Sequence, residues 1–268
     1  MKISLAGKFC YRYFPYRRKV IEDNIDLVFK HTISSEEKKT LIKAYYSHFF
    51  TTIKEIFQLG LGLKKFKQKP IFIGEEHLKK AFDRDKGVLI LGGHLGNFQL
   101  ASCLSARYFS HLGKFNVILK PISIKWIENI FYAGFDKNDV DKIISVKGWK
   151  KILSKLKQKE AIFFAFDQHA SIVKGHGIAV DFFGKKAATY TSLAVVTKLT
   201  QAAVIPAYTY RDEHGKHHIL CLPPIEWIGH EDKDTEIYLN TLNYNQVLEK
   251  MILACPAQWI WSHRRWKI

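Results

Sequence analysis

The spacing of apolar residues changes near residue 87, and the two halves of the pattern predict different structures. Residues 1–66 have helical spacing. One apolar stripe in this part consists of Leu41, Tyr45, Phe49, Ile53 and Phe57. Ser34 and Glu37 have the pattern of a capping box that opens this helix, and the glycines at 60 and 62 are expected to end it.

After residue 87, short apolar runs alternate with segments of helical periodicity. We expect strands at 87–91, 115–119, 161–166, 178–182, 202–207 and 217–222. Helices are expected near 97–109, 123–134, 148–158, 189–200 and 235–254. This alternation is typical of an α/β fold with a largely parallel central sheet flanked by helices. We therefore expect an N-terminal helical arm (1–66) and an α/β domain (67–268).

The formal net charge of +17 implies an anionic partner, which could be nucleic acid, an acidic protein, a phosphorylated substrate or an acidic membrane surface. The four cysteines are scattered without metal-ligand spacing, so we expect reduced thiols and no metal site. No segment has the roughly 18–20 consecutive apolar residues of a membrane-spanning helix. Any contact with a bilayer is therefore expected to be peripheral.

One strand end carries a histidine in a glycine turn, the place where α/β folds usually locate their chemistry. His94 follows the expected strand at 87–91, and Asn97 can cap the helix that comes next. The backbone amides of Gly96 and Asn97 are candidate donors to a developing oxyanion. Taken alone, however, this short string also fits an ordinary loop histidine.

Three other places carry candidate chemistry. Asp167 follows the apolar strand at 161–166, as either a turn former or a site residue. The mixed segment 174–186 is either a loop with an edge strand or part of an acyl-chain groove with a phosphate-binding rim. The tail interleaves basic residues with Trp259, Trp261 and Trp266. It fits nucleic-acid stacking, a membrane interface, or a C-terminal strand with buried tryptophans.

Together these segments resemble the late acyltransferases of lipid A biosynthesis over nearly the whole chain. His94 with Gly96 and Asn97 matches the catalytic histidine of that family. The resemblance also covers Pro15–Lys19, Asn24, Glu55, Lys120-Pro121, Asp167-Gln168, Phe182-Phe183-Gly184, Thr189, Pro206 and the closing block 256–267.

The chain departs from the family pattern at Gln99, where the family has a carboxylate five residues after its histidine. The Gln99 amide oxygen could still accept the Nδ1 proton of His94, but without negative charge. Asp167 is the other carboxylate that could orient the histidine. Family members also usually begin with an apolar anchor helix. This chain would instead hold the membrane through Phe9, Tyr11, Tyr13, Phe14 and Tyr16 among Arg12, Arg17 and Arg18, with the basic run at 64–69.

The resemblance implies a glycerolipid-acyltransferase-like fold and an O-acyltransferase without cofactor or metal. Its implied donor is acyl carrier protein and its acceptor a phosphorylated glycolipid, at the cytoplasmic face of the inner membrane. His94 would be the general base. Substrate-binding candidates are Lys120, Phe183, Gly184, Arg264 and Arg265. Three alternatives stay open: another donor such as acyl-CoA with another lipid acceptor, a catalytically impaired lipid-binding relative, and a nucleic-acid-binding protein.

Overall fold

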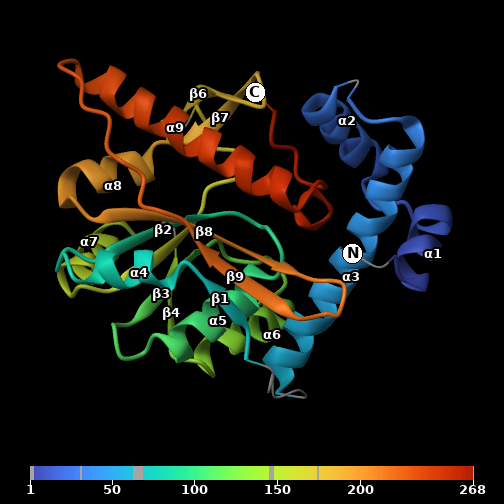
Figure 1. The fold of residues 1–268 in the computed structure, drawn as a ribbon, viewed down its shortest axis with the longest axis horizontal. Coiled ribbons are helices and arrows are strands. Elements are labelled where there is room, and N and C mark those ends of the chain that lie inside the picture. Colours follow the sequence, from blue (N-terminus) through green and yellow to red (C-terminus); the bar gives the residue numbers. More distant parts are fainter. Residues whose placement is uncertain (1–2, 31, 63–68, 145–147, 174, 268) are drawn as a thin grey trace.

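Helices and strands alternate along most of the chain (Figure 1). The computed structural model describes residues 3–30, 32–62, 69–144, 148–173 and 175–267. The helices are α1 (Leu5–Tyr13), α2 (Arg18–Phe29), α3 (Ser35–Leu61), α4 (Glu75–Phe82), α5 (Phe98–Tyr108), α6 (Lys125–Asp136), α7 (Trp149–Lys157), α8 (Ser192–Thr200) and α9 (Lys233–Ala254). The strands are β1 (Ile71–Ile73), β2 (Val88–Gly92), β3 (Phe115–Leu119), β4 (Val140–Ile144), β5 (Ala161–Ala165), β6 (Gly177–Phe182), β7 (Lys185–Tyr190), β8 (Ala203–Arg211) and β9 (His217–Cys221).

Within these residues, seven strands form one sheet in the order β1-β9-β8-β2-β5-β3-β4. All neighbouring pairs are parallel except β8 and β9, which are antiparallel. Strands β6 and β7 form a separate antiparallel hairpin. The expectation of a largely parallel sheet flanked by helices is therefore confirmed.

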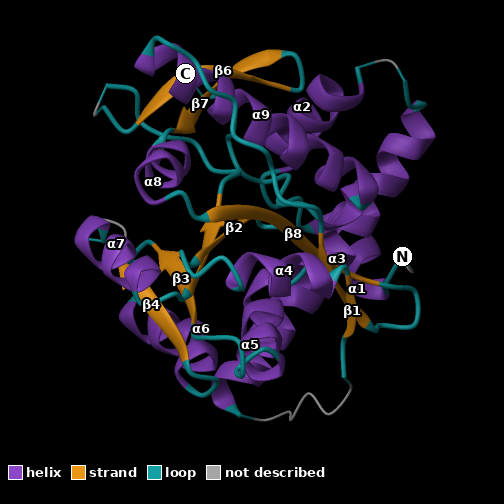
Figure 2. Ribbon diagram, turned by 60° about the vertical axis from the view of Figure 1, so that its left-hand side comes forward, coloured by secondary structure: helices purple, strands orange, loops and turns teal. Residues whose placement is uncertain are grey.

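Two apolar layers enclose the central strand β2, because its side chains alternate between the faces of the sheet. Leu89 and Leu91 pack in the layer that contains α7, α8 and α9, whereas Val88 and Ile90 face α4, α5 and α6. Figure 2 shows the sheet between these groups of helices. All five residues of β2 are buried, and this packing holds the end of the strand, where the next loop begins, in a fixed place.

The arm helices share the core with the rest of the chain. The capping box of Ser34 and Glu37 opens α3 as expected. Gly7 lets α1 approach α3, since a Cβ atom at Gly7 would lie 1.9 Å from Ser47 Oγ. Asn24 of α2 donates to the carbonyl oxygen of Trp261 at 2.7 Å. The boundary expected between residues 66 and 67, and most of the basic run at 64–69, lie outside the described residues.

The structure corrects several expected elements. The strand at 178–182 belongs to the hairpin and not to the main sheet, and residues 185–190 are strand β7, so the helix expected at 189–200 begins at Ser192. Sequence patterns missed β1, α4 and β4, which are short. The edge strand β4 also carries Asp141 and Lys142, which interrupt its apolar run. No helix in the described part of the chain is long and apolar enough to cross a bilayer.

Candidate active site

Two neighbouring parallel strands bring His94 and Asp167 together. Gly92 of β2 is paired in register with Ala165 of β5, and Phe166 N donates to the Gly92 carbonyl oxygen at 2.8 Å. His94 and Asp167 each lie two residues beyond this pair. The carboxyl ends of parallel strands meet at one edge of the sheet, which is where α/β proteins place their sites.

The Asp167 carboxylate has three donors. His94 Nδ1 lies 2.8 Å from Oδ1, while Oδ2 accepts from His94 N at 2.6 Å and from Trp259 Nε1 at 3.0 Å. The Asp167 side chain is fully buried, whereas that of His94 is 21% exposed. Position 93 must be glycine here, since a Cβ atom on Gly93 would lie 2.9 Å from Asp167 Oδ2.

These contacts determine the protonation of the pair. Burial alone would raise the pKa of Asp167, but the interactions with His94 and the hydrogen bond from Trp259 outweigh it and lower the pKa to about 2. An ionised carboxylate accepts the Nδ1 proton of His94, which leaves the lone pair of a base on Nε2; this lone pair faces Gln168 Nε2 at 3.2 Å. His94 and Asp167 therefore have the geometry of a general base and its orienting carboxylate.

Gln99 does not contact His94. It is buried at the start of α5, and its Nε2 donates to the carbonyl oxygen of Phe131 on α6. The expectation that Gln99 accepts the Nδ1 proton of His94 was wrong, because Asp167 Oδ1 occupies that position.

This geometry reverses the expected effect of restoring a carboxylate at position 99. Gln99→Glu should lower stability by about 3 kcal/mol, because it buries a charge and loses the donor to the Phe131 carbonyl oxygen. It should not raise the rate of the folded enzyme. Thermal unfolding and initial rates check this, with Gln99→Met as the control that removes the donor without adding charge. A faster Gln99→Glu enzyme would contradict this orientation.

The turn after His94 corrects the oxyanion expectation. The amide of Gly96 donates to the carbonyl oxygen of Gln258 at 2.9 Å, so it is already engaged. Asn97 caps α5 as expected, since its Oδ1 accepts from Leu100 N at 3.0 Å. The helix N-terminus lies beside the histidine, and its partial positive charge favours developing negative charge there. The role of the Asn97 amide stays a prediction.

Lys120 and Gln168 extend the site along the same sheet edge. Lys120 follows β3, lies 5.2 Å from the centre of the Tyr190 ring, and has its Nζ 3.3 Å from Gln168 Oε1. Gln168 Nε2 lies 3.2 Å from His94 Nε2. Sequence reasoning gave Gln168 no role, although its place directly after Asp167 at a strand end was a usable signal.

The other substrate-binding candidates divide into surface and buried residues. Phe183 and Gly184 form the two-residue turn between β6 and β7, both with positive φ, and Phe183 N donates to Glu249. Arg264 is exposed. Arg265 is fully buried, and its guanidinium donates to Ala188 O and Thr189 Oγ1. Arg265 as a ligand for substrate phosphate was therefore wrong.

The closing block is part of the core. Trp259 and Trp261 are 1% and 0% exposed, and no strand is described over the last residues 259–267. For these two side chains the interpretations as a nucleic-acid stacking surface and as a membrane interface are thus wrong. The expectation of buried tryptophans is confirmed for them, but not as part of a terminal strand. Trp259 instead serves as a donor to Asp167.

An apolar pocket begins beside His94 and extends between the sheet and α5. The rings of His94 and Phe98 are 4.9 Å apart in edge-to-face contact, and Phe98 stacks on Phe163 at 5.7 Å. The pocket wall includes Gly93, Leu95, Phe98, Ala101, Phe163 and Tyr208. A base next to an apolar pocket suits a polar reaction on a molecule with a hydrocarbon chain.

The pairing of a partly exposed histidine with a buried carboxylate at this sheet edge is an arrangement that suits general-base catalysis in an α/β enzyme. Residues 3–268 match the bacterial lipid A biosynthesis acyltransferase family; the chain belongs to this family and is an acyltransferase.

Three known proteins show how far the similarity extends. The chain is 24% identical over 273 residues to the lipid A biosynthesis lauroyltransferase of Escherichia coli (strain K12), covering 97% of this chain and 82% of the relative. It is 22% identical over 256 residues to the palmitoleoyltransferase of the same strain, covering 95% and 80%. Among solved structures, the 1-acyl-sn-glycerophosphate acyltransferase of Thermotoga maritima aligns with a TM-score of 0.41 and 14% identity, over 92% and 95% of the two chains.

Proposed function

We propose that the protein transfers a fatty acyl group from acyl carrier protein to a hydroxyl group of a lipid A precursor or a similar glycolipid. The observation that carries this proposal is the pairing of His94 with the buried Asp167, next to an apolar pocket whose wall includes Gly93, Leu95 and Phe98. Family membership and the activities of the two Escherichia coli relatives support the substrate class.

In the proposed reaction, the oxygen of the acceptor hydroxyl attacks the thioester carbonyl carbon while His94 Nε2 takes the hydroxyl proton. The carbon–sulfur bond then breaks, and the leaving thiolate takes the proton back from His94. Asp167 stays ionised and stabilises the imidazolium that forms between the two steps. The pocket under α5 would take the acyl chain, and the exposed Lys120 and Arg264 would face the acceptor phosphates.

The donor assignment is supported by charge. A formal net charge of +17 favours an acidic carrier protein and a phosphorylated acceptor together. The alternative of an impaired lipid-binding relative depended on the missing carboxylate at Gln99, and Asp167 removes that reason. The nucleic-acid alternative depended on charge and on three tryptophans, of which Trp259 and Trp261 are buried.

The test is a transfer assay with the purified protein and a labelled acyl chain. Acyl carrier protein and coenzyme A are compared as donors, and a lipid A precursor and a lysophospholipid as acceptors. We expect acylated lipid A precursor from the carrier-protein donor. Product formed only from coenzyme A, or only on the lysophospholipid, would refute the assigned substrates.

We further propose that α1 lies on the anionic cytoplasmic face of the inner membrane. Leu5, Phe9 and Tyr13 follow one another at intervals of four residues, and their exposed fractions are 84%, 59% and 70%. The opposite side of α1, with Gly7 and Cys10, is buried. An apolar stripe that faces outward beside exposed Lys8 and Arg12 fits the interface of an anionic bilayer.

The double variant Phe9→Ser/Tyr13→Ser should weaken binding to anionic lipid vesicles by at least about 10-fold, because two aromatic rings no longer enter the interface. Sedimentation with vesicles measures the effect. Leu199→Ser is the matched control, since Leu199 is 62% exposed on α8, away from α1 (Figure 1). Equal loss of binding in the control would argue against docking through α1.

A further inference from the structure

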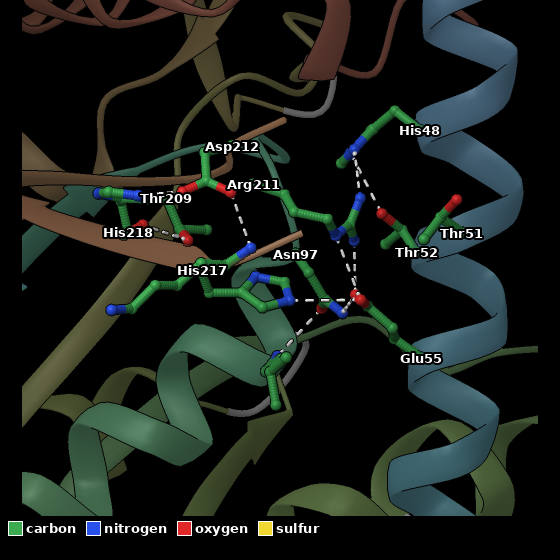
Figure 3. A network of polar contacts seen from close by, with 12 residues as sticks. His48, Thr51, Thr52, Glu55, Asn97, Thr209, Arg211, Asp212, His217 and His218 are labelled. Atoms are coloured by element: carbon green, nitrogen blue, oxygen red, sulfur yellow. Dashed lines mark hydrogen bonds and ion pairs between the residues drawn. The ribbon is translucent and has the colours of Figure 1, made fainter. Parts of the chain in front are cut away.

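The N-terminal arm contributes a buried carboxylate to a polar network near His94 (Figure 3). Glu55 of α3 accepts hydrogen bonds from Arg211 Nη2 at 2.5 Å and from Asn97 Nδ2 at 2.9 Å, and lies 3.3 Å from His217 Nε2. Glu55 is 9% and Arg211 8% exposed. One side chain of the arm thus joins the ends of β8 and β9 to the first turn of α5.

At the centre of the network lies the buried ion pair of the Glu55 carboxylate and the Arg211 guanidinium. Burial would raise the pKa of Glu55, but His217 and the Arg211 guanidinium lower it to about 2, so the carboxylate is ionised. Burial and the charge of Arg211 lower the pKa of His48 to about 3, so this ring is neutral at neutral pH. His48 Nδ1 lies 3.4 Å from Arg211 Nη1. Such a buried ion pair adds little to stability compared with an apolar replacement. Its role in the protein therefore depends on where it lies in the fold.

The position is the turn that begins at His94. Asn97 is occupied at both ends of its side chain: Oδ1 caps α5 and Nδ2 donates to Glu55. The amide of Gly96 is held by its hydrogen bond to the carbonyl oxygen of Gln258. Asp167 fixes the imidazole ring, and the network fixes the backbone that follows it.

We propose that Glu55 is a positioning residue for His94. The Glu55–Asn97 hydrogen bond holds the turn so that Nε2 of His94 faces the acceptor hydroxyl. This inference rests on the proposed role of His94 as the general base. It also means that the arm takes part in catalysis as well as in the expected contact with a membrane.

The test compares two buried carboxylates. Glu55 and Glu236 have side chains that are both 11% exposed and both paired with a cation, Arg211 in one case and Lys198 in the other. Glu55→Gln and Glu236→Gln should both melt at lower temperature. In fully folded protein, only Glu55→Gln should lower kcat, on the order of 10- to 100-fold, with KM nearly unchanged. Equal kcat in the two variants would overturn the proposal.

A second variant covers the case in which Glu55→Gln fails to fold. Asn97→Ser keeps a hydroxyl cap for α5 and leaves the pair of Glu55 and Arg211 intact, but its side chain is one atom shorter than that of Asn97 and ends short of Glu55. It should fold and show the same loss of kcat. A folded Asn97→Ser enzyme with the kcat of the wild type would overturn the proposal.

A readout without substrate separates this inference from the proposed function. The ring signals of His94 in NMR spectra, assigned by comparison with His94→Ala, should shift in Glu55→Gln and Asn97→Ser and stay in place in Glu236→Gln. If the wild type transfers no acyl group but the signals shift as expected, the function is wrong and the positioning is right. Signals that do not move would refute the positioning even in an active enzyme.

Discussion

Replacing His94 with alanine should lower the rate of acyl transfer by about 10³-fold or more. The variant lacks the group that takes the hydroxyl proton. General-base catalysis typically raises the reaction rate by about 10²- to 10⁴-fold. Of the two side chains, that of His94 is the one open to solvent, since it is 21% exposed whereas that of Asp167 is fully buried. Initial rates at saturating donor and acceptor measure the effect.

The fold of this variant should remain, since Asp167 keeps the donors from the backbone of residue 94 and from Trp259. Thermal unfolding and vesicle binding check this. His214→Ala is the matched control, because this histidine is 82% exposed and distant in sequence from both strand ends. A His94→Ala enzyme that keeps more than about a tenth of the rate would remove the histidine from the mechanism.

Asp167→Asn should reduce the rate by about 10⁴-fold, the loss seen when the orienting aspartate of a Ser-His-Asp triad becomes an amide. Asn has the shape of Asp but only one acceptor oxygen, while three N–H groups converge on the Asp167 carboxylate. The amide nitrogen therefore meets a donor, or the ring of His94 takes the other tautomer. Transfer rates of Asp167→Asn and of the exposed control Asp181→Asn are compared.

The stability of the fold should depend on pH, because the pKa of Asp167 differs between the folded and the unfolded chain. The pKa of Asp167 in the fold is lowered to about 2, below its ordinary value of 3.8. Its charge therefore stabilises the fold above about pH 4, and this contribution is lost as the pH falls through the folded-state pKa. The wild type should lose its stability advantage over Asp167→Asn between pH 5 and pH 2. An advantage that does not depend on pH would contradict an ionised Asp167.

The sheet edge that carries the candidate site could largely be predicted from the expected strands. The apolar runs that end before His94 and before Asp167 are visible in the sequence, and both became strands of one sheet. Their contact depends on β5 lying next to β2 in register, with β3 beyond it. Strand order arises from packing over the whole sheet, so the sequence offered Asp167 only as either a turn former or a site residue.

The error at Gln99 has a geometric cause. The turn ends at Asn97, and Gln99 is the second residue of α5, where the helix directs its side chain toward α6. A spacing of five residues between His94 and Gln99 contains no information on that direction. Arg265 was misjudged for a similar reason, because its acceptors lie 76 and 77 positions earlier in the chain.

The hydrogen bond from Trp259 to Asp167 spans 92 positions, and Asn24 reaches 237 positions to Trp261. Such long sequence separations delay closure of these contacts during folding. On a translating ribosome, His94 and Asp167 are made well before Trp259, so Asp167 can gain this donor only after the C-terminal block has been synthesised. A chain truncated before Trp259 should therefore transfer acyl groups more slowly, because Asp167 loses one of its three donors.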